Sequence, residues 1–364
     1  DYYASRGLGD VYKRQVLIND ATRENIWHIK FARMFDMSND SHLFYTYSQL
    51  VDKGAKLEGN KFLLNNQFYV PLYEGKMIWH YNHHFGTINE GTKEKPARQM
   101  AMPTSDELKN PNHNIMPWYW IPKEDMDNRL IKTDAKGNII WEWSHKWLIG
   151  FRDITNATHD RTFVISLIPD ACGVGHSATL LFVERGTMPG ALLLGMMSSL
   201  VFDYATRQKI GGSHASISFV KQFPVLTPEQ VSSSGYEQDI VERVARLCWF
   251  NHDLDGWMEE LREECPEEYD LPEEPVIWDE EQRTVWQAEL DAIFAHLYGL
   301  TTEDLRYILD PEDVCGKGCI NETFRVLKER ELRELGEYRT KRLVMEAWNK
   351  FEFDNKLKML CYEK

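Results

Sequence analysis

Three histidines lie within five residues, in the segment His80-Tyr81-Asn82-His83-His84. Neutral imidazoles are common ligands of transition metals, and histidine together with asparagine also occurs in one class of metal-dependent nuclease. Side chains alternate between the faces of a β-strand, so a strand would place His80 and His84 on one face and His83 on the other. Such a nuclease also spreads its residues over a longer hairpin–helix unit. We therefore expect a polar strand face here, with no catalytic residue and no metal site.

The cysteines indicate no metal site either. Cys315 and Cys319 flank a short glycine-containing loop, but tetrahedral zinc would need a second pair of ligands. The other cysteines are scattered singly, at positions 172, 248, 265 and 361. We therefore expect a loop with two free thiols. The sequence also lacks a P-loop, a Gly-x-Gly-x-x-Gly turn after a strand, a Gly-x-Ser-x-Gly elbow and a His-Glu-x-x-His motif.

The chain of 364 residues has a formal net charge of −15, and this excess is local. Residues 237–291 carry 19 acidic and 4 basic side chains, whereas the remaining residues carry 38 of each. Charge therefore neither supports nor excludes nucleic-acid binding by the remainder. Glu259-Glu260 and Glu263-Glu264 lie one helical turn apart, which is typical of a solvated helix face; the alternative is a surface that docks a basic partner.

Six cysteines and no recognisable secretory signal lead us to expect a cytoplasmic location.

Apolar runs and turn residues predict a mixed α+β fold that is β-rich from about Phe62 to Pro224. Before that region, the spacing of Trp27, Phe31 and Phe35 fits one face of a helix. Residues 134–138, with the sequence DAKGN, indicate a turn. The expected strands are a hairpin of 68–72 with 77–81, followed by 118–121, 139–143, 162–168, 178–183, 216–219 and 221–225.

Inside the β-rich region we expect a long apolar helix that begins after Pro189-Gly190 and ends at about Lys209. Its apolar stretch, residues 191–202, is shorter than the ~20 residues that span a bilayer, so we expect no membrane association. Beyond Pro228 the pattern predicts an all-α domain. Its expected helices include 286–297, a shorter one capped by Thr301 and a last one containing 335–351.

Several separated segments resemble large bacterial adenine-N6 DNA methyltransferases of restriction–modification and phage-defence systems, of the type IIG kind. The resemblance covers nearly all of residues 16–351 and lies downstream of the family's catalytic domain. One pair of segments, 192–212 with 218–226, is similar to the closing helix and strand of target recognition domains. The matching segments are MFDMSNDSHLFYT (34–46), FYVPLYEGKMIWHYNHHFGT (68–87), IGFRDITNATHDRTFVISLIP (149–169), LLLGMMSSLVFDYATRQKIGG (192–212), SFVKQFPVL (218–226), AELDAIFAHLYGLTTEDLRYILD (288–310) and GEYRTKRLVMEAW (336–348).

The chain departs from this family in its catalytic motifs. Family enzymes bind S-adenosylmethionine through a glycine-containing turn and act through an Asn-Pro-Pro-Tyr tetrapeptide, and neither occurs here. Asn110-Pro111-Asn112-His113 lacks the second proline and the aromatic residue. We therefore expect a fragment that needs no cofactor and does not methylate DNA, while the full-length enzyme would use S-adenosylmethionine. Residues 5–15 resemble translated sequencing-adapter sequence. This independently leads us to expect a fragment, with the native sequence starting near Val16.

The family resemblance and the adapter-like start together lead us to expect four segments along the chain. Residues 1–15 are a non-native segment, and residues 16–61 connect to the missing catalytic domain. Residues 62–228 form a target recognition domain that binds double-stranded DNA, and residues 229–364 form an acidic helical domain. The expected partners are double-stranded DNA, the missing methyltransferase domain and a nuclease or helicase subunit.

Candidate DNA contacts are the cations, amides and hydroxyls that suit phosphates and base edges. Arg152 and Arg161 could instead pair with Asp153 and Asp160. Two rival functions remain open: an independent metal-dependent nuclease centred on residues 80–84, and a protein-interaction subunit that docks through the acidic helices. The candidate contacts are Lys76, His80, His83, His84, Arg152, Asn156, Arg161, Arg207, Lys209, Ser213, His214 and Lys221.

Overall fold

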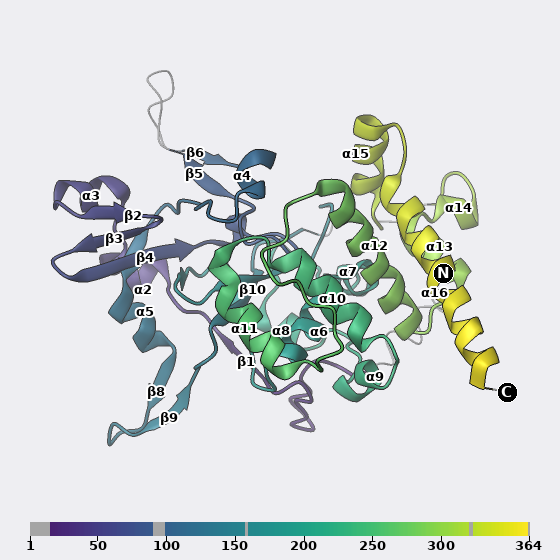
Figure 1. Ribbon diagram of the computed structural model, residues 1–364, viewed down its shortest axis with the longest axis horizontal. Helices are drawn as coiled ribbons and strands as arrows, with labels where there is room; N and C mark the ends of the chain where they lie inside the picture. The colour runs from purple at the N-terminus through teal and green to yellow at the C-terminus, as the bar shows by residue number, and fades with distance from the viewer. Residues whose placement is uncertain (1–14, 90–98, 157–158, 320–322, 363–364) are drawn as a thin grey trace.

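The computed structural model describes residues 15–89, 99–156, 159–319 and 323–362. It is the mixed α+β fold that the sequence predicts, with the β-sheets in the N-terminal half and helices dominating the C-terminal half. Figure 1 shows the small sheets and hairpins gathered at one end of the molecule and the long helices at the other.

Two sheets form the β-rich half. The first is antiparallel, with strand order β1-β13-β10-β11. In the second, the order β12-β4-β3-β2 is extended by β7, which pairs with β4. Two further hairpins, β5–β6 and β8–β9, complete this half. The strands are β1 (Ile29–Ala32), β2 (Lys56–Glu58), β3 (Lys61–Leu64), β4 (Gln67–Tyr73), β5 (Thr87–Asn89), β6 (Gln99–Ala101), β7 (Trp120–Pro122), β8 (Ile131–Thr133), β9 (Ile139–Glu142), β10 (Trp147–Arg152), β11 (Ile165–Pro169), β12 (Gly173–Val174) and β13 (Ala178–Val183).

The helices up to α5 are short, and all the long helices, namely α6, α10, α11, α12, α15 and α16, come later in the chain. α12 packs along α16 at the end of the molecule farthest from the hairpins (Figure 1). The helices are α2 (Met37–Asp40), α3 (Tyr47–Asp52), α4 (Ser105–Lys109), α5 (Lys123–Arg129), α6 (Thr187–Ser198), α7 (Leu200–Arg207), α8 (Ile217–Val220), α9 (Pro228–Ser232), α10 (Glu237–Cys248), α11 (Asp255–Glu264), α12 (Glu280–Leu297), α13 (Thr302–Leu309), α14 (Glu312–Cys315), α15 (Arg325–Leu335) and α16 (Arg339–Tyr362), with 3₁₀ turns η1 (Ser41–Leu43), η2 (Gly75–Met77) and η3 (His252–Leu254).

Helix α6 is the centre of the core. It is apolar on all sides because β11 and β13 pack on it from one direction and α10, α11 and α12 from another. Its glycines allow close approach: a Cβ on Gly190 would lie 2.9 Å from the Trp147 ring. Its N-terminus is closed by Glu264, whose carboxylate accepts hydrogen bonds of 2.8 Å from the N–H groups of Thr187 and Met188. One hydrophobic cluster therefore runs across the expected boundary at residue 228.

The structure confirms several expected elements and corrects others. β13 spans residues 178–183 as predicted, the DAKGN turn joins β8 to β9, and Thr301 caps α13. Phe31 lies in strand β1, so the expected helical face of Trp27, Phe31 and Phe35 was wrong. Residues 77–81 form no hairpin with β4, which pairs instead with β3, β7 and β12. Residues 217–220 form helix α8 rather than a strand.

The expected single helix to Lys209 is two helices. Ser199 is extended, with ψ of 152°, and its hydroxyl accepts from the Phe202 N–H to cap α7. The freed N–H of Leu200 donates to the Asp291 carboxylate at 2.7 Å. In the described part of the chain, no single helix is long and apolar enough to cross a membrane; α6 and α7 pass that test only as a pair, and they meet at 61°.

Candidate functional site

The loop after β10 and the loop after α7 pair with each other and form one surface. The Thr155 N–H donates to the Ser213 carbonyl at 2.9 Å, and the Ala215 N–H donates to the Asp153 carbonyl at 2.7 Å. This pairing exposes Asn156, Ser213 and His214 side by side. The His214 imidazole lies 2.9 Å from the Asp153 carboxylate while more than half of its side chain stays exposed.

Arg152 ties this surface to the turn after β4. Its guanidinium donates to the carbonyls of Gly75 (2.8 Å) and Ile78 (2.7 Å), and its central carbon lies 4.9 Å from the centre of the Trp79 ring. A Cβ on Gly75 would lie 2.4 Å from the Ser177 carbonyl, so the turn requires glycine here. Burial lowers the pKa of Arg152 to about 10, which leaves it a cation at neutral pH.

Two hollows lie on either side of Arg152. One, of about 320 Å³, is lined by Trp79, Arg161 and Thr162, and the other, of about 490 Å³, by Phe44, Tyr119 and Lys76. Both also include Ile154 and His159. We call the group Lys76, Trp79, Arg152, Ile154, Asn156, His159, Ser213 and His214 the Arg152 surface. It offers cations, an amide, imidazoles and an aromatic ring, which are the groups that contact phosphates, base edges and base faces.

A buried ion cluster below this surface holds Arg207 and Arg161. The Asp203 carboxylate accepts from the N–H groups of Thr162 and Phe163 and lies 3.0 Å from the Arg207 Nε and 3.7 Å from the Arg161 Nε.

The Arg207 guanidinium then donates to the carbonyls of His159 and Asp160 at 2.7 and 2.6 Å. Arg207 is buried, so it supports the loop that carries His159 instead of presenting a cation to a duplex.

Lys209 and Lys221 lie beside other partners. The Lys209 ammonium donates to the Gln222 carbonyl at 2.6 Å, and the Lys221 ammonium lies 2.9 Å from the Asp20 carboxylate. Lys221 lines a separate hollow with Val16, Ile18 and Ile217. Contact between DNA and these two lysines stays a prediction.

The histidines at 80, 83 and 84 are buried, which argues against direct contact with DNA. Residues 79–82 form a tight turn, with Trp79 bridged to Asn82 and Tyr81 at φ of 57°. The expected alternation of faces was therefore wrong: the rings of His83 and His84 lie 4.4 Å apart, centre to centre.

Burial lowers the pKa of His80 well below its usual range, with Arg161 and Arg152 adding to the effect.

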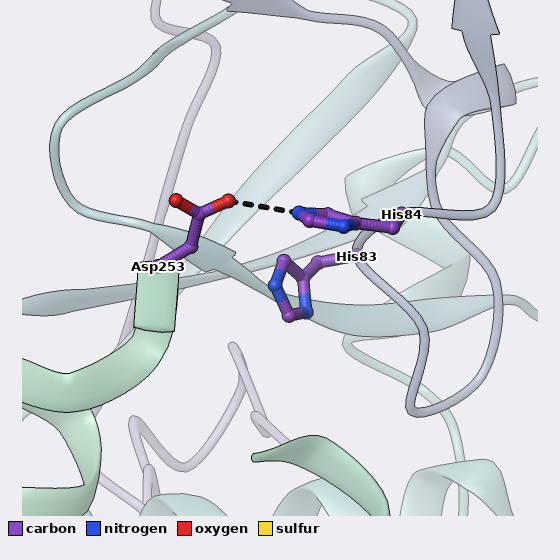
Figure 2. A group of neighbouring side chains, drawn as sticks. All are labelled: His83, His84 and Asp253. Carbon is purple, nitrogen blue, oxygen red and sulfur yellow. Dashed lines mark hydrogen bonds and ion pairs between the residues drawn. The ribbon is translucent and has the colours of Figure 1, made fainter. Parts of the chain in front are cut away.

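Figure 2 shows His83 and His84 facing the carboxylate of Asp253. Asp253 lies in the short turn η3, which follows α10. The His84 Nε2 lies 2.8 Å from the Asp253 Oδ2, across a sequence separation of 169 residues. Burial lowers the pKa of His83 well below its ordinary value, and His84 is the next contributor. The group is a polar cluster inside the fold, joining the N-terminal half to the helical half.

The sequence analysis missed three charged residues that contribute to these clusters. Arg33 follows β1 and approaches the Asp153 carboxylate at 3.6 Å, which adds a half-exposed cation beside the Arg152 surface. Asp203 and Asp253 bind arginine and histidine partners, respectively, across the fold. Only the Asp203 pairing with Arg207, at a spacing of four residues on a helix, carried a local signal.

The acidic residues of α11 are partly tied into the fold. The Glu260 carboxylate accepts hydrogen bonds from the Lys146 N–H, the Trp147 Nε1 and the Thr187 hydroxyl, and it lies 2.7 Å from the His145 Nδ1. With Glu264 closing α6, two of the four glutamates therefore face the core-forming elements, so the expectation of a solvated face holds only in part. Cys315 and Cys319 carry free thiols, as expected.

Comparisons with known proteins return no match, either among protein-family models or among curated proteins.

Proposed function

We propose that this chain is the DNA target-recognition part of a bacterial adenine-N6 DNA methyltransferase and that the Arg152 surface holds the duplex. The main observation behind this proposal is that three segments far apart in the sequence meet on one surface. They contribute Lys76, Arg152 with Asn156, and Ser213 with His214. Each was selected from the sequence for its chemistry. The family resemblance supplies the second support, because its segments surround the same three places.

The chemistry of the surface supports a division of roles. Lys76 and Arg33 are partly exposed cations, which suit phosphates and set the register of a duplex. Asn156 and His214 are exposed and can exchange hydrogen bonds with base edges, where an amide suits adenine. Arg152 stabilises the turn between them. Methyl transfer, which requires extrusion of the adenine, would belong to a catalytic domain that carries S-adenosylmethionine.

The buried ion cluster supports the same proposal, because Asp203, Arg207 and Arg161 fix the loop that carries His159. A recognition surface must hold its hydrogen-bonding groups in place before the duplex arrives. The depth of His83 and His84 argues against the rival nuclease, since a phosphodiester would have to reach side chains that are almost fully covered.

A salt titration of duplex binding tests this proposal. We expect the full chain to bind with a log–log slope of about −0.9 per phosphate contact. Replacing Arg33 and Lys76 together by alanine should weaken binding and flatten that slope by up to about one unit per lost contact. The matched control is Lys350→Ala, which should leave the slope unchanged. Lys350 is an exposed lysine of α16 whose ammonium pairs with the Glu289 carboxylate of α12. Equal slopes in all three proteins, or no binding by the wild-type chain, would contradict the proposal.

A further inference from the structure

We propose that His83, His84 and Asp253 bind one divalent transition-metal ion of the zinc type, which ties the turn after β4 to the helical half. The three side chains offer two imidazole nitrogens and a carboxylate oxygen, and these atoms all lie within 4.8 Å of one another. Two nitrogens and one oxygen suit zinc and its neighbours in the transition series, whereas magnesium and calcium prefer oxygen ligands throughout.

An unpartnered buried nitrogen provides the independent observation. The His83 Nε2 has no hydrogen-bond partner, although only 1% of the residue is exposed. The His83 ring lies against Phe250, with ring centres 4.8 Å apart, so an apolar side chain covers it. A buried polar atom without a partner destabilises the folded state. A metal ion bound at that lone pair would remove this destabilisation.

The separations of the ligand atoms bracket the tetrahedral value: one pair must open on binding, and the others, which lie up to 4.8 Å apart, must close. Zinc bonds of about 2.0–2.1 Å place neighbouring ligand atoms about 3.4 Å apart in a tetrahedron. The His84 Nε2 and the Asp253 Oδ2 are now 2.8 Å apart, as a direct hydrogen bond. Opening that pair by roughly half an ångström makes room for the ion. Asp253 sits in the short turn η3 with its side chain about a quarter exposed, so it has freedom to move.

A hollow reaches the Asp253 side of the proposed site, whereas His83 and His84 lie deeper in the fold. Asp253 lines a hollow of about 340 Å³ together with Asn60, Lys61, Cys172 and His252. Three protein ligands with one open position define the arrangement in which water completes the tetrahedron. Because His83 and His84 precede Phe85 while Asp253 precedes α11, the bound ion would join segments far apart in the sequence. The proposal is independent of DNA binding.

The test is metal binding by the full chain after treatment with a chelator. Titration with Zn²⁺ should show one equivalent bound and a rise in the thermal midpoint, since a ligand of the native state stabilises it. Titration with Co²⁺ should give the intense visible absorption of a tetrahedral site. His83→Gln and Asp253→Asn should each weaken binding at least about 10-fold, and the second variant retains a hydrogen-bonding group for His84. His80→Gln, a buried histidine in the same segment, is the matched control and should bind normally.

The free thiols of Cys315 and Cys319 are the competing source of a zinc signal. The double variant Cys315→Ser/Cys319→Ser should therefore keep the full stoichiometry and the Co²⁺ spectrum. Loss of binding in that variant, together with unchanged binding in Asp253→Asn, would overturn the proposal. So would a wild-type chain that binds less than one equivalent of either metal.

Discussion

Replacing Asp203 by alanine is expected to lower the free energy of unfolding by about 3–5 kcal/mol, because it leaves the buried Arg207 without its counter-ion. Asp203 is fully buried and also accepts hydrogen bonds from the N–H groups of Thr162 and Phe163. Both arginine partners would lose their anion at once. Denaturant unfolding followed by circular dichroism measures the change.

Two further variants make this prediction specific. Asp127→Ala removes an exposed carboxylate paired with Lys123, and such surface pairs contribute about 0–1 kcal/mol. Combining Asp203→Ala with Arg207→Met removes the buried charge as well, so it should recover part of the loss. A loss below about 1 kcal/mol for Asp203→Ala alone would show that the cluster does not hold the fold in this way.

Replacing Asp291 by asparagine is expected to raise stability above neutral pH and to change it little near pH 4. Burial raises the pKa of this carboxyl to about 7, although Arg161 and the Leu200 N–H both favour its charged form. Between pH 4 and 7 the unfolded chain therefore ionises Asp291 while the native chain keeps its proton. The native state is disfavoured by up to about 1.4 kcal/mol per pH unit across that window.

The direction of the pH dependence of stability follows from the raised pKa of Asp291. A raised acid pKa means that the native state binds more protons, so stability falls as pH rises to about 7 and the penalty is constant above it. Asparagine keeps an acceptor for the Leu200 N–H and carries no charge. Thermal midpoints at pH 5 and pH 8 measure the effect, with Glu281→Gln, an exposed position on α12, as the control. A gain that is equal at both pH values, or larger at pH 5, would contradict the assignment.

The elements that the sequence predicted well depend on local signals. Thr301 and Asp304 form a capping box that starts α13, and β13 is a short apolar run bounded by polar residues. The missed elements depend on distant partners. Helices α6 and α7 separate at Ser199, where the Asp291 carboxylate from α12 supplies an acceptor for the Leu200 N–H. Nothing within residues 191–209 signals that bond.

The residues of the candidate site also fall into those that local sequence identifies and those whose surroundings depend on distant partners. Residue chemistry was enough to select Asn156, Ser213 and His214, which are exposed. It could not show that His83 and His84 would be buried, because the covering residue Phe250 and the partner Asp253 lie more than 160 positions later in the chain. The burial of Arg207 could not be predicted for the same reason, since its carbonyl acceptors at His159 and Asp160 are brought to it only by the fold.

Photo-crosslinking of the full chain to duplex DNA, followed by mass-spectrometric mapping of the attached peptides, would locate the DNA-binding surface. We expect crosslinks within residues 75–79, 152–156 and 211–216 and at His159, which together contain the Arg152 surface. Helices α10 to α12, which span most of the acidic segment 237–291, should carry none, because their net negative charge repels phosphates. Crosslinks confined to that acidic segment, or none at all under conditions where the chain binds DNA, would show that the Arg152 surface does not hold the duplex.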